Sequence, residues 1–173
     1  MIRYFLALIA AAACLPLIAR AQKTPAGTPS SRDGWPVVVL DKPFHIGDQT
    51  MRQYRHPKPM GREFNADFEL DEIPLAIYVE IKVSYLMHPR SKKYRGGAYK
   101  TKLLLNGDEV AVLNEELPRR APKDGAARIV VRVRNKHLKK GANELTIRGG
   151  GLEKNTNDFE LHTINLHSRQ PRR

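Results

Sequence analysis

The chain has 173 residues, 30 of them basic and 18 acidic, and its formal net charge is +12. A chain of this length fits one domain that can bury a core of its own. The single cysteine, Cys14, lies near the amino terminus. Disulfides, redox chemistry and a cysteine nucleophile are therefore excluded from the remainder of the chain.

The first 21 residues have the pattern of a signal peptide. Arg3 gives a positive start, residues 4–18 are apolar apart from Pro16, and Ala19-Arg20-Ala21 matches the small-x-small cleavage pattern. We expect cleavage after Ala21 and a periplasmic or secreted protein. The apolar run is too short to anchor the chain as a transmembrane helix.

A lipoprotein anchored through Cys14 is the alternative to simple secretion. Lipoprotein signals favour a larger aliphatic residue three places before the cysteine, where this chain has Ala11. Simple secretion is therefore the preferred interpretation. Without Arg3 and Arg20 the mature chain of 152 residues carries 28 basic and 18 acidic residues, a net charge of +10. Such an excess favours anionic partners outside the cytoplasm, although generic basicity and solubility would explain it too.

Composition divides the mature chain into three parts. Residues 22–34 are rich in Thr, Pro, Gly and Ser and are typical of a flexible linker. Residues 35–167 form the predicted domain, and residues 168–173 form a short basic tail.

Apolar and polar residues alternate along most of this domain, which is typical of strands with one buried face. The predicted strands are 36–40, 64–70, 75–85, 99–105, 110–112, 128–134, 145–147 and 159–166. Helical spacing is nearly absent. Seven or eight short strands joined by turn-rich loops predict an all-β, two-layer antiparallel sandwich.

Three local features refine this prediction. Asn106-Gly107 predicts a two-residue hairpin, because both residues tolerate positive φ. The apolar phase slips after Leu161, so we expect a β-bulge near His162 and Thr163. Strand 75–85 should bury its odd-numbered residues from Leu75 to Tyr85 in the core.

Three segments in the second half resemble the galactose-binding-like jelly-roll superfamily. They are Leu-Leu-Leu-Asn-Gly at 103–107, Leu-Lys-Lys-Gly-Ala-Asn-Glu-Leu-Thr-Ile at 138–147, and Asp-Phe-Glu-Leu at 158–161. The resemblance covers about residues 64–166 and implies a jelly roll of the kind found in carbohydrate-binding modules. It also implies a possible structural calcium, with Asp158 and Glu160 facing Asp67 or Glu69.

Sugar-binding members of this superfamily commonly present exposed aromatic rings. Trp35, Tyr54, Tyr94 and Tyr99 are the candidates for such rings in this chain. The rings are few, so the resemblance indicates the fold more strongly than it indicates the ligand.

No catalytic or metal-binding motif stands out in the sequence. The six histidines show no metal-ligand spacing, and surface positions are expected for them. Ser84 and Ser91 lack the setting of a nucleophile elbow. The acidic row Asp67, Glu69 and Asp71 and the basic row Arg128, Arg132 and Arg134 are expected to form cross-strand ion pairs.

The basic segment 90–102 is the predicted ligand site. Cations for an anionic chain alternate there with rings for stacking, and Gly96-Gly97 loosens the loop. The candidate residues are Arg90, Lys92, Lys93, Tyr94, Arg95, Tyr99, Lys100 and Lys102. A solvated basic turn is the plainer interpretation. Two smaller patches comprise Lys136, Lys139 and Lys140, and Arg119, Arg120 and Lys123.

The sequence thus predicts a non-catalytic exported binding module without a cofactor that recognises glycan, with anionic polysaccharide favoured. The alternative is a structural or adaptor component of a cell-envelope protein complex. A small secreted hydrolase is the weakest of the three interpretations.

Overall fold

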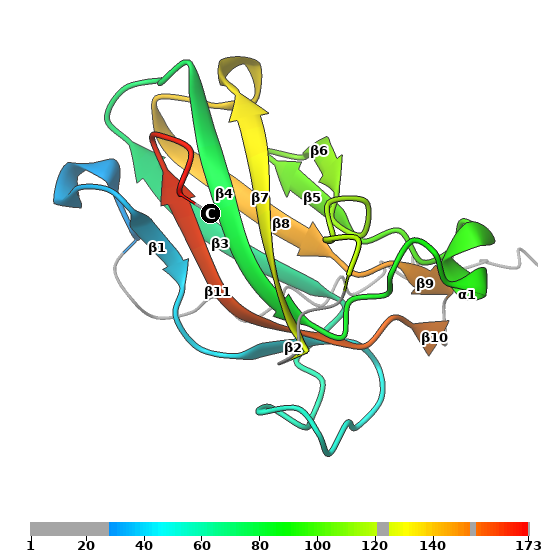
Figure 1. Ribbon diagram of the computed structural model, residues 1–173. Coiled ribbons are helices and arrows are strands. Elements are labelled where there is room, and N and C mark those ends of the chain that lie inside the picture. Colours follow the sequence, from blue (N-terminus) through cyan, green and yellow to red (C-terminus); the bar gives the residue numbers. More distant parts are fainter. Residues whose placement is uncertain (1–27, 121–124, 153–154, 173) are drawn as a thin grey trace, which may run out of the picture.

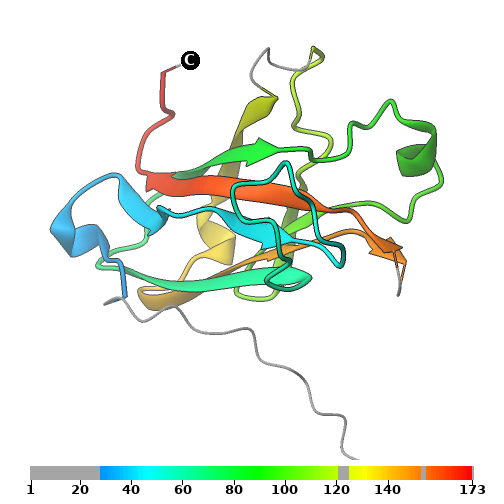
Figure 2. The same cartoon turned by 90° about the horizontal axis from the view of Figure 1, so that it is seen from below.

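The computed structural model describes residues 28–120, 125–152 and 155–172, and it confirms the prediction of an all-β sandwich (Figure 1). Two antiparallel sheets pack against each other, and Figure 2 shows them as two layers seen from below. The predicted signal peptide lies outside the described residues. Among those residues, no helix is both long and apolar enough to cross a membrane.

The five-stranded sheet faces the viewer in Figure 1. Its strands run in the order β1-β11-β4-β7, and β2 pairs with β11 beyond the end of β1. They are β1 (Val37–Leu40), β2 (Phe44–Ile46), β4 (Ala76–Ser84), β7 (Ala126–Arg134) and β11 (Phe159–His167). Strand β7 is therefore an edge strand.

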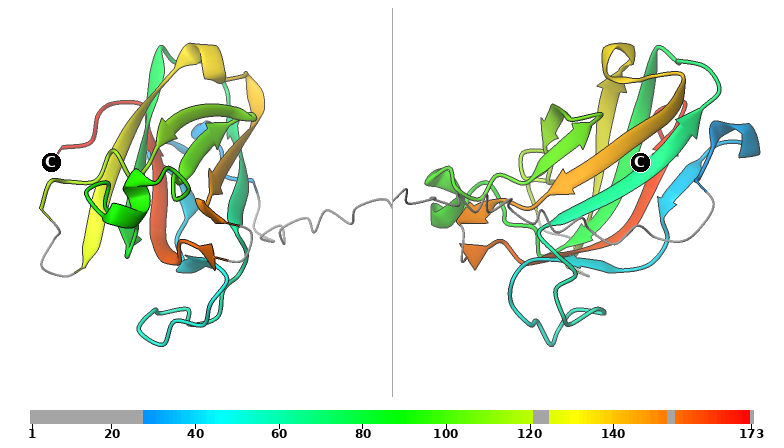
Figure 3. Two further views of the ribbon diagram at one scale, coloured as in Figure 1. Left: turned by 90° about the vertical axis from the view of Figure 1, so that its right-hand side faces the viewer. Right: turned by 180° about the vertical axis from the view of Figure 1, so that it is seen from behind.

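The second sheet lies behind the first, and the reversed view in Figure 3 brings it to the front. Its strands, in the order β3-β8-β5-β6, are β3 (Glu63–Leu70), β8 (Gly141–Arg148), β5 (Lys102–Leu105) and β6 (Asp108–Val112). The smaller elements are β9 (Gly151–Leu152), β10 (Asn155–Thr156), α1 (Lys92–Arg95), η1 (Ser31–Asp33) and η2 (Asn135–His137).

The core lies between the two sheets and follows the predicted alternation. Phe68, Ile77, Ile81, Leu145 and Phe159 are among its fully buried side chains. Each such side chain removes a large apolar surface from water, which is the main force holding a domain without disulfides together.

The alternation fails at both ends of the predicted strand 75–85. Leu75 is 86% exposed and Tyr85 is 51% exposed, so the prediction that they are buried is wrong. The strand itself spans only Ala76–Ser84. Tyr85 follows it with a φ of 64°, which turns its side chain out of the strand's alternation.

Both predicted local features of the sheets are present. Leu105 pairs with Asp108 across a two-residue turn, in which Asn106 has φ 53° and Gly107 has φ 89°. On β11, the register with β4 shifts between Leu161 and Thr163, which makes His162 the extra residue of a bulge.

Two segments without a predicted element are ordered. Ser91 caps α1 by accepting a hydrogen bond from the N–H of Tyr94 at 3.1 Å. Within the predicted linker, Ser30 bridges to Glu69 and the Pro29 carbonyl accepts from the Glu69 N–H at 2.8 Å. The folded contacts thus begin inside the carboxyl-terminal end of that linker.

Candidate anion-binding surface

The structure overturns the predicted ion pairs between the acidic and basic rows. Strand β3 pairs with β8, and β7 pairs with β4, so the two rows lie on different sheets. Arg128, Arg132 and Arg134 therefore face no carboxylates from β3. The charges of Arg132 and Arg134 therefore remain available to an external partner, whereas Arg128 pairs with Glu80.

The outward side chains of β4 and β7 form a continuous surface, which we name the β4–β7 face. Register places Lys82 directly opposite Arg128, and Tyr78 opposite Arg132. Its principal side chains are Tyr78, Glu80, Lys82, Arg128, Val130, Arg132 and Arg134. Four of them are cations and one is an acid.

Glu80 neutralises only part of this surface. It forms ion pairs with Arg128 and with His167 of β11, the latter at 2.8 Å. The hydrogen bond from Arg128 lowers the pKa of Glu80, because it favours the ionised carboxylate. Among the described residues, no carboxylate lies within ion-pair distance of Lys82, Arg132 or Arg134, and all three are exposed.

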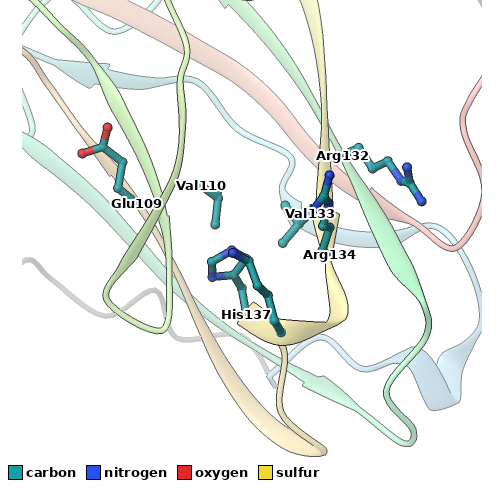
Figure 4. A pocket seen from close by; sticks show the side chains of 7 residues that line it. Glu109, Val110, Arg132, Val133, Arg134 and His137 are labelled. Atoms are coloured by element: carbon teal, nitrogen blue, oxygen red, sulfur yellow. The ribbon is translucent and has the colours of Figure 1, made fainter.

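A pocket of about 290 Å³ opens where β7 meets the edge strand of the other sheet. Val110 of β6 and Val133 of β7 lie on opposite sides of it, with His137 beside them (Figure 4). Arg132 also lines the pocket, and in this view its side chain lies on the far side of Val133 from Val110. Lys136 and Arg134 add basic groups to the pocket lining.

The opposite outer surface of the sandwich has the reverse charge. The outward residues of β3 and β8 include the carboxylates Glu63, Asp67, Glu69 and Glu144, and we name this surface the acidic face. Arg148 pairs with Glu63 there. The two sheets thus present charge of opposite sign on opposite sides of the molecule.

The predicted site at 90–102 has its cations but not its stacking rings. Arg90, Lys92, Lys93, Arg95 and Lys100 are exposed, whereas Lys102 is half-buried and pairs with Glu109 at 2.7 Å. Tyr94 and Tyr99 are only 7% and 8% exposed. The prediction that these rings are exposed is wrong, because each packs inward from its loop.

The Tyr94 ring has a structural role. Its hydroxyl donates to Glu115 at 2.8 Å, and burial together with this carboxylate raises the pKa of Tyr94 to about 12. Helix α1 lies beside β9 and β10, away from η2 and the pocket (Figures 1 and 3). The predicted loop and the β4–β7 face are therefore separate basic surfaces.

Of the two remaining predicted rings, Tyr54 differs from expectation and Trp35 does not. Tyr54 is 4% exposed, so it cannot present its ring, whereas Trp35 is 36% exposed. Tyr85, expected in the core, is instead exposed directly after β4 and stacks on Tyr54 with ring centroids 4.7 Å apart. Sequence alternation missed it because Tyr85 leaves the strand geometry.

His45, Tyr54, Asp158 and Glu160 form a buried polar cluster where β2 and β11 meet. Asp158 Oδ1 accepts from the N–H groups of Asp48 and of Gln49, at 3.1 and 3.0 Å, and lies 3.1 Å from His45 Nε2. Tyr54 donates to the Asp158 carbonyl at 2.7 Å. The fully buried His45 contradicts the expected surface position of the histidines.

This cluster also corrects the implied calcium site. Asp158 and Glu160 face β2 and the segment 47–60, whereas Asp67 and Glu69 lie on the other sheet. The Asp158 carboxylate is engaged by protein N–H groups instead. Across the described ranges, no three His, Cys, Asp or Glu side chains gather as a metal site would require.

The two smaller basic patches have different positions. Lys136, Lys139 and Lys140 are exposed in and just after η2, and Lys136 also lines the pocket. Arg119 and Arg120 are exposed on the loop after β6, and Lys123 lies outside the described residues.

Comparisons with known proteins add no assignment to this geometry. No protein-family model matches the chain, and no curated protein matches it significantly. The site must therefore be interpreted from its own residues.

Proposed function

We propose that this protein is an exported binding module that holds an anionic glycan along its β4–β7 face. The observation that carries the proposal is the cationic row of Lys82, Arg132 and Arg134, which no described carboxylate neutralises. Cations on such a surface attract a polyanion and release its counterions on contact.

The dimensions of the row favour a polymer over a small anion. Arg128 and Arg134 are six residues apart on one strand, which corresponds to about 20 Å at the usual strand rise. A chain that repeats its negative charge can contact several cations along this length. A small anion would contact one or two.

Two aromatic rings beside the row, Tyr78 and Tyr85, support a glycan as the polymer. Tyr78 lies opposite Arg132, and the exposed Tyr85 follows the last residue of β4. Aromatic rings present apolar faces on which sugar rings can stack. The predicted export and the resemblance to galactose-binding-like jelly rolls favour glycan over nucleic acid.

Heparin, a sulfated polysaccharide, is the probe for this proposal, and neutral dextran is its control. The mature protein should bind heparin but not dextran, and its affinity should fall steeply with salt. The triple variant Lys82→Gln, Arg132→Gln, Arg134→Gln should weaken heparin binding. The logarithm of the binding constant falls with the logarithm of the salt concentration. The slope of this plot should become less steep by about one unit for each cation that no longer meets a sulfate group.

A matched variant tests the location of the site. Lys92→Gln, Lys93→Gln, Arg95→Gln removes the same charge from α1 and should leave most of the affinity. Equal losses in both triple variants would mean generic basicity and would contradict the proposal. A loss confined to the α1 variant would assign binding to segment 90–102. If the wild-type protein binds no polyanion, the envelope-adaptor alternative takes precedence.

A further inference from the structure

Ser84, His162 and Glu160 lie together at the end of β4, on the outer side of the five-stranded sheet. Ser84 Oγ is 2.6 Å from His162 Nε2, and His162 Nδ1 is 3.8 Å from Glu160 Oε2. In acyl-transfer enzymes the histidine contacts both the serine and a carboxylate, and such constellations arise on unrelated folds. Here the Ser84 contact is a hydrogen bond, whereas the 3.8 Å contact with Glu160 is longer than a hydrogen bond and acts through charge.

The pairing of β11 with β4 brings these residues together, next to the bulge at His162. Ser84 pairs directly with Glu160, and the extra residue His162 comes next on the same outer side. Without the bulge, regular alternation would place Glu160 and His162 two residues apart in one row and return Thr163 to the core side. Each residue is visible in the sequence, but no local pattern pairs β4 with β11.

Buried contacts hold Glu160 in place. Glu160 is 1% exposed, and its Oε1 accepts from the His56 N–H at 2.7 Å. Its other carboxylate oxygen is the one that faces His162. This carboxylate can balance the charge of an imidazolium that forms when His162 takes a proton.

The backbone leaves the extended region immediately after Ser84. Tyr85 has a φ of 64°, a left-handed conformation that is uncommon for an aromatic residue. Residues held in such conformations gather at active sites, where the surrounding structure fixes them. Ser84 is 7% exposed and the His162 side chain 10%, so only a small reagent has access to the pair.

We propose that Ser84 is an activated nucleophile, with His162 as its base, that cleaves small acyl esters. Ser84 Oγ would attack the ester carbonyl carbon while its proton passes to His162 Nε2. That proton then leaves with the alcohol as the C–O bond breaks, and an acyl-serine remains. Water, deprotonated by His162, releases the acid and restores Ser84. The proposal is independent of the β4–β7 face.

A small alkyl fluorophosphonate tests the nucleophile directly. Ser84 Oγ should form a bond to phosphorus as fluoride leaves, which adds one phosphonyl group to the intact mass. Peptide mapping should locate the label on Ser84. Ser84→Ala and His162→Gln should each reduce labelling by at least about 100-fold, the usual effect of losing a nucleophile or base.

Matched variants separate chemistry from folding. Ser168→Ala removes an exposed serine, and His167→Gln removes another histidine of β11 that pairs with Glu80. Both should label like the wild type. Each variant's melting temperature is measured first, and the labelling temperature is set below the lowest of them. A folded wild-type protein that takes no label, or one labelled elsewhere than Ser84, would overturn the proposal.

Glu160 acts through His162 and is a positioning residue in this scheme. With p-nitrophenyl acetate as substrate, Glu160→Gln should lower kcat and leave KM unchanged, because the residue does not contact the ester. An unchanged kcat in the folded variant would remove Glu160 from the scheme. Hydrolysis that survives Ser84→Ala at the wild-type rate would contradict the whole proposal.

Discussion

Glu80 sets how much positive charge the β4–β7 face presents. It is the one acid among the outward residues of β4 and β7, and it contacts both Arg128 and His167. Its side chain is about 20% exposed, so the pair with Arg128 is only partly screened by water. Removing this carboxylate changes both the stability of the protein and its attraction for polyanions.

Glu80 should contribute to stability above the acid range only. Its pKa is lowered in the folded protein from the ordinary value of 4.5. A carboxyl with a lowered pKa stabilises the fold while ionised, and this stabilisation is lost as the pH falls through the folded-state pKa. The unfolding free energy from urea titrations should therefore drop less in Glu80→Gln than in the wild type between about pH 6 and pH 3. If the unfolding free energies of the two proteins fall in parallel with pH, the ion pair between Glu80 and Arg128 does not contribute to stability.

The same substitution should strengthen the proposed glycan binding. Glu80→Gln frees Arg128 and removes the only negative charge of the face, so heparin affinity should rise about two- to fivefold at moderate salt. Glu144→Gln, on the acidic face, changes the net charge equally and serves as the control. An equal gain in both variants would show that net charge alone governs binding.

The hairpin between β5 and β6 positions one side of the pocket. Asn106 donates to the His137 carbonyl at 2.8 Å and accepts from the Glu144 N–H at 3.1 Å, which ties the turn to η2 and β8. Val110 is thereby held opposite Val133. The turn depends on Gly107, whose φ of 89° is unfavourable for residues with a Cβ.

Gly107→Ala should cost about 1–2 kcal/mol of stability, the usual penalty for a left-handed residue with a side chain. A Cβ at this position would meet no atom within 4 Å, so the loss is conformational. Gly96→Ala is the control, since Gly96 has φ −71° and should tolerate alanine or gain up to about 1 kcal/mol. Thermal denaturation of both variants measures the difference. Equal melting temperatures would mean that the turn accommodates an alanine at residue 107 by changing its backbone conformation.

For the molecule as a whole, the core of the sandwich carries the stability. Ile81 is fully buried between the sheets, so Ile81→Ala should cost about 2–5 kcal/mol in urea unfolding. Leu75→Ala removes an 86% exposed leucine and should change stability by less than about 0.5 kcal/mol. A small effect at Ile81 would mean that the register of β4 is wrong.

Much of this architecture could be predicted from local sequence patterns. The alternation of apolar and polar residues, the turn dipeptide and the shift in alternation at the bulge each depend only on residues that are neighbours in the chain. The Asn106-Gly107 hairpin and the bulge at His162 are examples. What could not be predicted was pairing between distant strands. That pairing separates Arg132 from the acids of β3 and brings Ser84 to His162. The inward packing of Tyr94 depends likewise on a residue distant in sequence, Glu115, which accepts from its hydroxyl.

The basic and acidic faces give the molecule an electric dipole that runs across the sandwich. In the field of a polyanion such a dipole experiences a torque, so the β4–β7 face turns toward the chain before contact and productive encounters become more frequent. Once bound, the molecule would present its carboxylates, Asp67 and Glu144 among them, to the surroundings. A second polyanion that approached from that side would meet these carboxylates and be repelled there.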